Sequence, residues 1–306
     1  MLRQSFSKLL QSQRVVSSLT KSSSSTAAPA YNFETLAVTT PKPYVLHIEF
    51  DREDKFNSMT TEMWAEMVTC FNQASYDENV RSIVLSGRGR MFTCGLDLME
   101  AGQSLMQVKG ADVARKAFTL HKFIGHAQDS CTVIDKCWKP VICAVHGACI
   151  GGGMDVFAAC DIRNCSEDAY FSVKEVDVGL AADLGSLQRL SKIMANDSLV
   201  RELCYTARKF GAKEAKEYGL VSKVYKDKDE LLNHSIELAE MIASKSPIAV
   251  QSTKHHLNFS RDHSIEAGLE YMRAWNASML QTEDLMKSAQ ALMMKKTPKD
   301  IEFAKL

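Results

Sequence analysis

The chain has 306 residues, of which 45% are apolar, and its 37 basic and 37 acidic side chains cancel to zero net charge. This length and composition fit one or two globular domains, and the zero net charge argues against a nucleic-acid binder, which needs a basic excess. No apolar run approaches the ~20 residues that cross a bilayer, so no membrane insertion is expected.

The two ends of the chain resemble targeting signals. Residues 1–33 contain no acidic side chain and are basic and serine-rich, which is typical of a mitochondrial transit peptide that is removed or disordered. A disordered tail without an address is the alternative. At the other end, Ala304-Lys305-Leu306 is close to the Ser-Lys-Leu peroxisomal signal. We therefore expect the protein in the mitochondrion, the peroxisome or both.

The body of the chain alternates between strand and helix patterns. Apolar or alternating runs predict strands at residues 44–50, 80–86, 140–146, 162–164 and 170–173. Helical spacing predicts helices at residues 60–74 and 111–137, and a turn followed by a helix at residues 147–161. This order predicts an α/β fold with right-handed crossovers and at least partly parallel strands.

From Leu184 to Lys296 the pattern is helical, interrupted only by a short strand at residues 221–225. Apolar positions such as Tyr271, Trp275 and Met279 form a face with few sheet partners. Two interpretations remain open for this face: plain core packing and an oligomer interface. We divide the body into a core at residues 34–240 and a helical oligomerisation region at residues 241–306.

The nine cysteines form no Cys-x-x-Cys pair, and most of them lie in apolar stretches. An odd number of cysteines in such surroundings indicates small buried side chains in a reducing compartment. We therefore expect no disulfide framework and no metal site.

Two glycine-containing turns follow predicted strands, at residues 92–98 and 150–155. Three consecutive glycines, Gly151 to Gly153, are costly within a helix but suit a place where backbone N–H groups approach a ligand. Two such turns on adjacent strands predict an oxyanion hole, in which two N–H donors bind one oxygen. A phosphate cradle is the rival interpretation, but neither glycine-rich nucleotide motif is present.

Three carboxylic acids stand in apolar surroundings near these turns: Asp155, Glu175 and Asp183. Asp183 either caps a helix that begins near Leu184 or is a poorly solvated acid with a raised pKa. Asp155 either favours the dipole at the start of a helix or takes part in chemistry. The three acids together, beside a predicted oxyanion hole, favour proton transfer next to a carbonyl.

The segment Ala144-Val145-His146-Gly147, the glycines Gly151 to Gly153, Asp155 and Cys160-Asp161-Ile162-Arg163 resemble the crotonase (enoyl-CoA hydratase/isomerase) superfamily. The resemblance runs from about Tyr44 to the C-terminus. It implies an α/β spiral of ββα units with a helical C-terminal trimerisation region, assembled as a homotrimer or homohexamer. It also implies an acyl-CoA substrate whose thioester oxygen binds the N–H groups of Leu96 and Gly152.

By the same resemblance, the acyl-CoA site is lined by Gly152 and by the segment Cys94-Gly95-Leu96-Asp97-Leu98. The loop Arg52 to Asn57 matches a CoA-contacting loop only in part, because Glu53 stands where the usual proline follows the arginine. Its contacts with CoA are therefore left unassigned.

The acids indicate which branch of the superfamily the chain resembles. Hydratases carry two glutamates at the positions of Asp155 and Glu175 and a glycine at that of Asp183. All three acids of this chain instead match the branch that isomerises 3,5-dienoyl-CoA to 2,4-dienoyl-CoA in β-oxidation of unsaturated fatty acids. The resemblance assigns Glu175 to the α carbon, protonated Asp183 to the ε carbon and a supporting role to Asp155. It implies no metal and no cofactor, because the CoA thioester is part of the substrate. The alternatives are an enoyl-CoA hydratase and, more distantly, a non-catalytic RNA-binding or scaffolding homologue.

Overall fold

The computed structural model describes residues 31–306, so the expected targeting segment at residues 1–33 lies almost wholly outside the described part. A six-stranded sheet in the order β1-β2-β3-β4-β6-β9 forms the centre of this part. Its strands are β1 (Leu36–Lys42), β2 (Val45–Phe50), β3 (Ser82–Gly87), β4 (Val141–Val145), β6 (Ile162–Ser166) and β9 (Lys223–Tyr225). β1 and β2 are antiparallel, and every other neighbouring pair is parallel.

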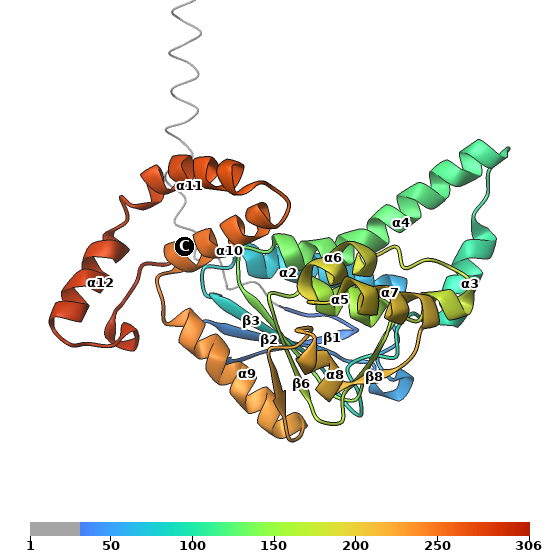
Figure 1. Ribbon diagram of the computed structural model, residues 1–306, viewed down its shortest axis with the longest axis horizontal. Helices are drawn as coiled ribbons and strands as arrows, with labels where there is room; N and C mark the ends of the chain where they lie inside the picture. The colour runs from blue at the N-terminus through green and yellow to red at the C-terminus, as the bar shows by residue number, and fades with distance from the viewer. Residues whose placement is uncertain (1–30) are drawn as a thin grey trace, which may run out of the picture. The chain divides into compact units, whose positions relative to one another are not determined.

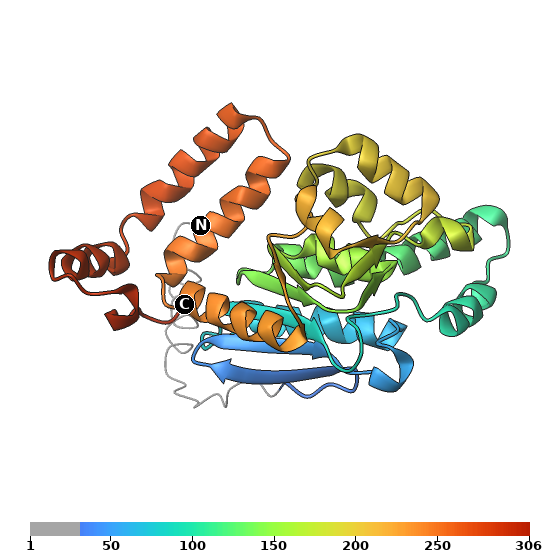
Figure 2. The same ribbon diagram turned by 60° about the horizontal axis from the view of Figure 1, so that its bottom comes forward.

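Helices cover both faces of this sheet, which explains why β3 and β4 are buried along their whole length. On one face, Val84 and Ile142 pack against α9 (Lys228–Ala243). Figure 2 shows this helix lying beside the first strands of the sheet. On the other face, Ile83 and Leu85 belong to the large core that includes α2 (Thr61–Tyr76), α4 (Val113–Lys136) and α5 (Gly152–Ala159).

A second, three-stranded sheet carries the segments that were singled out for function. It consists of β5 (Ala148–Ile150), β7 (Tyr170–Ser172) and β8 (Phe210–Gly211), with β5 and β7 parallel. The chain turns from β5 into α5 through the glycines, and β7 leads into a short 3-10 helix, η2 (Glu175–Val178). Two parallel strands that end at the same edge therefore bring the glycine turn and Glu175 together.

The predicted strands and helices of the body are confirmed within a few residues, and three strands were not predicted. β1 has seven residues but no strong alternation, β5 lies where a turn was predicted, and β8 interrupts the region after Leu184 that was predicted to contain only one strand. β5 and β8, with three and two residues, carry too little sequence pattern to be recognised.

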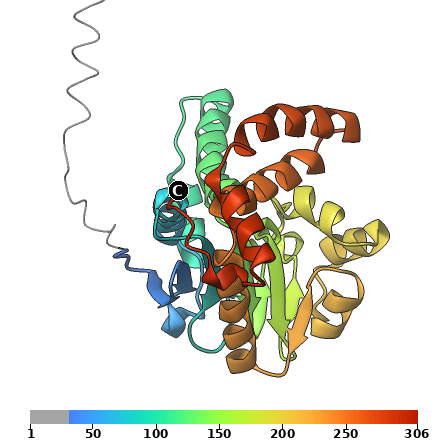
Figure 3. The same cartoon turned by 90° about the vertical axis from the view of Figure 1, so that its left-hand side faces the viewer.

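The remaining helices lie around and beyond the sheets. They are α3 (Leu98–Gln107), α6 (Ser186–Ile193), α7 (Asp197–Thr206), α8 (Ala212–Glu217), α10 (Pro247–Arg261), α11 (Ile265–Met279) and α12 (Glu283–Met293). The last three extend away from the sheet on the side opposite to α3 and the start of α4 (Figures 1 and 2), and Figure 3 views the molecule from their side. None of the helices in residues 31–306 has the length and apolarity that crossing a bilayer requires.

Candidate active site

A cavity of about 370 Å³ opens between the glycine turns, α2, α4 and the loop after η2. Its wall is mostly apolar, and its polar groups come from two carboxylic acids, one lysine and exposed backbone. The lining residues that the sequence had singled out are Cys94, Gly95, Leu96, Leu98, Gly152, Glu175 and Asp183. The cavity therefore brings together the two glycine turns and two of the three acids.

The first turn, residues 93–98, is held against the second by backbone contacts. Thr93 forms an isolated parallel bridge with Cys149. A Cβ atom on Gly95 would lie 2.7 Å from the carbonyl oxygen of Ile150, and the φ angle of Gly95 is +91°. Only glycine satisfies both conditions, so the two turns approach each other as closely as bare backbone allows.

Asn57 braces the first turn from behind. Its side-chain Nδ2 donates to the carbonyl oxygens of Met91 and Phe92 at 2.9 and 3.1 Å, and its own carbonyl accepts from the Thr93 hydroxyl at 2.6 Å. Asn57 is completely buried. The loop Arg52 to Asn57, whose ligand contacts the sequence left unassigned, therefore has a structural role in shaping the first turn.

The structure accounts for each of the three glycines of the second turn in a different way. Gly151 has a φ angle of +52°, which turns the chain from β5 into α5. A Cβ on Gly153 would lie 2.3 Å from the Thr93 side chain, too close for any other residue. Gly152 is the first residue of α5 and lies on the cavity wall.

The N–H groups of Leu96 and Gly152 are available to a ligand. Neither group donates a hydrogen bond to an acceptor within residues 31–306. Both residues line the cavity, and Gly152 stands at the start of α5, where the partial positive charge of the helix dipole favours an anionic oxygen. The two turns can thus present two main-chain donors to one cavity.

Glu175 follows β7 and faces the glycine turn. A Cβ on Gly151 would lie 3.4 Å from its Oε1 atom, and its buried Oε2 has no hydrogen-bond partner among the described residues. Burial, together with the nearby charge of Asp155, raises the pKa of Glu175 to about 7. A carboxyl group that titrates near neutral pH is suited to accept a proton.

Asp155, in the first turn of α5, is only 1% exposed and does not line the cavity. Its Oδ1 accepts a hydrogen bond from the Ser186 N–H at 2.6 Å, whereas its Oδ2 has no partner in the part of the chain that is described. Burial raises the pKa of Asp155 to about 6, against the opposing effects of Ser186 and Arg189. Asp155 thus lies behind the cavity as an electrostatic neighbour of Glu175.

Asp183 lines the cavity from the loop between η2 and α6, but its environment differs from the expected one. The side chain is exposed, because the loop from Gly179 to Asp183 runs along the surface. Partial desolvation nevertheless raises its pKa. The capping alternative is wrong, because α6 begins at Ser186 with Gly185 before it, and the carboxylate that binds its first N–H belongs to Asp155.

Asp97, in contrast to its neighbours in the first turn, does not line the cavity. Its carboxylate accepts from the Ser58 hydroxyl at 3.0 Å and lies 3.7 Å from Arg52. A hydrogen bond from the Glu100 N–H, with these two contacts, holds the pKa of Asp97 below its usual range despite some burial. The side chain fastens the turn to the neighbouring loop.

The apolar wall of the cavity was missed by the sequence reasoning. It comes from α2 and α4 and consists of Trp64, Leu120, Phe123, Ile124 and Ala127. The four residues on α4 follow the i, i+3, i+4, i+7 spacing of one helix face, so the signal was present but indistinguishable from core packing. This wall suits an extended hydrocarbon chain, and the carboxyl groups would then lie beside that chain.

All nine cysteines lie within the described residues and are free, and eight of them are buried. The expectation of small buried thiols is therefore confirmed. The exception is Cys94, which is half-buried at the cavity.

Comparison with known proteins gives consistent results. The family model described as enoyl-CoA hydratase/isomerase matches residues 41–300. The chain is 53% identical to human mitochondrial Delta(3,5)-Delta(2,4)-dienoyl-CoA isomerase, with 91% of this chain and 85% of that protein covered. It is 44% identical to the peroxisomal enzyme of the same name from Arabidopsis thaliana, with 86% and 93% covered.

Solved structures show the same architecture. The crystal structure of an enoyl-CoA hydratase from Bacillus anthracis matches with a TM-score of 0.78 and 29% identity, covering 87% of this chain and 98% of that one. A putative enoyl-CoA hydratase from Streptomyces coelicolor matches with a TM-score of 0.80 and 26% identity, covering 90% and 98%.

Proposed function

The chain belongs to the enoyl-CoA hydratase/isomerase family, and on this premise we propose that it isomerises 3,5-dienoyl-CoA to 2,4-dienoyl-CoA in fatty acid metabolism. The names of relatives at 53% identity support this assignment, as do the three acids that distinguish it from a hydratase. The observation that carries the proposal is that one apolar cavity is lined by Glu175, Asp183 and the backbone of both glycine turns.

The reaction moves one proton over four bonds. Removal of a proton from the α carbon gives an extended enolate, conjugated with both double bonds, whose negative charge extends to the thioester oxygen. Addition of a proton at the ε carbon completes the shift of both double bonds. We assign the first transfer to Glu175 and the second to protonated Asp183. Two groups at opposite ends of a conjugated system serve carbons that one group cannot readily reach.

The thioester oxygen would bind the N–H groups of Leu96 and Gly152. Preorganised donors of this type contribute ~3–4 kcal/mol each to stabilisation of a transition state. Asp155 would support Glu175 by raising its proton affinity. The proposed reaction transfers no electrons and adds no water, so its chemistry needs no redox cofactor and no metal-bound hydroxide.

Two further proposals concern the location and the assembly of the protein. The human enzyme is mitochondrial and the Arabidopsis enzyme is peroxisomal, so we propose one or both compartments for this protein. We also propose a homotrimer or homohexamer, because α11 and α12 expose large apolar side chains such as Ile265 and Met293.

The test compares two substrates. The purified protein is mixed with a 3,5-dienoyl-CoA and, separately, with a 2-enoyl-CoA, and the ultraviolet absorbance is followed. We expect the absorbance of a conjugated 2,4-diene to appear with the first substrate. Rapid hydration of the 2-enoyl-CoA, with no diene formed from the other substrate, would show a hydratase instead.

A further inference from the structure

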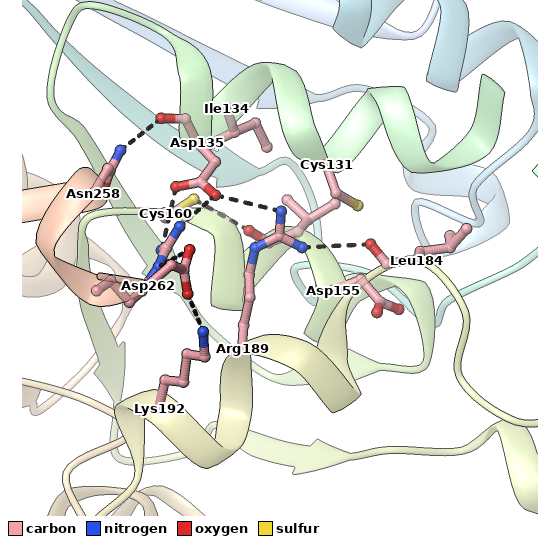
Figure 4. A network of polar contacts seen from close by, with 12 residues as sticks. Cys131, Ile134, Asp135, Asp155, Cys160, Leu184, Arg189, Lys192, Asn258 and Asp262 are labelled. Atoms are coloured by element: carbon pink, nitrogen blue, oxygen red, sulfur yellow. Dashed lines mark hydrogen bonds and ion pairs between the residues drawn. The ribbon is translucent and has the colours of Figure 1, made fainter. Parts of the chain in front are cut away.

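A network of charged side chains lies beside the loop that carries Asp183 (Figure 4). At its centre is Arg189 of α6, whose side chain is only 14% exposed. Its Nη1 donates to the carbonyl oxygen of Leu184 at 3.5 Å, and its Nη2 lies 3.5 Å from Oδ2 of Asp135 on α4. The residue directly after Asp183 is thus bound by a cation that is itself paired to another helix.

The contact between Arg189 and this loop leaves no room for a side chain. A Cβ on Gly185 would lie 1.8 Å from Nη1 of Arg189, and the φ angle of Gly185 is +131°. The guanidinium group therefore packs directly on the backbone of the loop. The Gln128 amide of α4 also holds this loop, because it donates to the carbonyl oxygen of Asp183 at 2.6 Å.

Asp135 is in turn held by the C-terminal helix α10. Its Oδ2 lies 2.9 Å from Nη2 of Arg261, and its backbone carbonyl accepts from Asn258 at 2.9 Å. α6, α4 and α10 are thereby linked through one carboxylate. Removing charges from water is costly, and such a network is better explained by the geometry it fixes than by net stability.

We infer that Arg189 is a positioning residue for the reaction proposed above, holding the Asp183 loop in place and placing a positive charge beside Asp155, with Asp135 and Arg261 fixing its orientation. This inference rests on the proposed function for its kinetic consequences. Its electrostatic part, the effect of the Arg189 charge on the pKa of Asp155, does not depend on the substrate.

The groups that face Asp155 define the expected electrostatic effect. Asp183 raises the pKa of Asp155, whereas Arg189 lowers it. Glu175, on η2, is coupled to it through the charge of Asp155. The facing thiols come from α4, β5 and α7, and burial keeps them protonated by raising their pKa values: they are Cys131, Cys149 and Cys204. Loss of the Arg189 charge therefore favours the protonated forms of the Asp155–Glu175 pair.

The experiment uses Arg189→Met, with Arg189→Lys as the variant that keeps the charge. Arg201→Met is the matched control, because Arg201 is 62% exposed on α7 and its side-chain partners among residues 31–306 are neighbours on its own helix, Asp197 and Tyr205. For Arg189→Met we expect kcat to fall about 10- to 100-fold with little change in KM, as for a displaced catalytic group. The acid limb of its pH profile should move to higher pH, because the pair titrates as a unit beside one cation fewer.

Arg189→Lys should keep the acid limb near its original pH and still lose part of kcat, because an ammonium group lacks the planar fork that bridges two acceptors. The pKa of Asp155 is measured in parallel by carbon NMR of the labelled, unliganded protein, and it should rise in Arg189→Met alone. If the unsubstituted protein has no isomerase activity but the pKa of Asp155 still rises in Arg189→Met, the proposed function is refuted and the effect of Arg189 on Asp155 stands. Normal kcat, an unmoved acid limb and an unchanged Asp155 pKa in a folded Arg189→Met protein would overturn the inference.

Discussion

The carboxylic acids at and behind the cavity stand in two different surroundings, a buried end formed by Glu175 with Asp155 and an exposed end formed by Asp183. At the buried end, Glu175 lines the cavity and Asp155 lies behind it, each with a carboxylate oxygen that has no hydrogen-bond partner within the described residues. At the other end, Asp183 lies exposed on a surface loop that Gln128 and Arg189 hold in place. Burial therefore sets the proton affinity of the first end, whereas loop position determines what the second end can do.

This difference suggests a division of labour within the proposed reaction. A carboxyl group with a pKa of about 7, such as Glu175, is a strong enough base to take a carbon-bound proton and is still ionised near neutral pH. An exposed acid exchanges protons with water, so Asp183 can be reprotonated after each turnover. The following variants test whether the two ends differ in this way.

The largest effect is expected at the buried end. Glu175→Gln keeps the shape of the side chain but removes the base, so kcat for isomerisation should fall about 10⁴-fold, the upper part of the range for general acid–base catalysis. Steady-state kinetics with a 3,5-dienoyl-CoA measure this loss. Asp177→Asn is the control, because this exposed carboxyl belongs to the same 3-10 helix and pairs with Lys174. A loss below tenfold in Glu175→Gln would rule out Glu175 as the base.

A smaller loss is expected at the exposed end. Asp183→Asn should lower kcat about 10²- to 10³-fold, because water that reaches an exposed site can replace part of the lost acid. Affinity for an acyl-CoA product, measured by calorimetry, should stay nearly unchanged. A parallel loss of affinity and activity would show instead that Asp183 shapes the cavity.

The third variant tests the partnership within the buried pair. Asp155→Asn retains an oxygen for the Ser186 N–H but removes the charge that raises the pKa of Glu175. The acid limb of kcat/KM, expected near pH 7, should move to lower pH, and kcat should fall about tenfold because a weaker base accepts the proton. An unchanged acid limb would show that the charge of Asp155 does not affect the pKa of Glu175.

The smallest effect concerns stability. In the folded protein the pKa of Glu175 is about 7, above its ordinary value of 4.5, so the folded state binds the proton more tightly and loses stability as pH rises through this interval. Glu175→Gln should therefore raise the free energy of unfolding by about 1–3 kcal/mol at pH 8 and by little at pH 4. Urea denaturation at both pH values measures the difference. Equal effects at both would contradict a charge-based cause.

Sequence patterning predicted α2 and α4 well because their helical periodicity extends over many residues, and it predicted β4 because this strand is an unbroken apolar run. Glycine spacing led to both turns, and the resemblance to a family selected the acids. Local sequence could not predict the exposure of Asp183, because its apolar neighbours Leu180 and Ala181 are exposed as well. Nor did it reveal Arg189, whose partners Leu184 and Asp135 are a near neighbour and a residue on a distant helix. Such partners are fixed by tertiary packing.

The proposed oxyanion donors belong to peptide groups, and every amino acid except proline supplies such a group. Position 96 can therefore diverge in side chain, and reshape the space offered to the acyl tail, without deleting a donor. Substitutions should instead be most damaging at Gly95 and Gly153, where even a methyl group would collide with Ile150 or Thr93. Substrate preference and charge stabilisation are thus encoded at separate positions, so directed evolution can change the former and leave the latter intact.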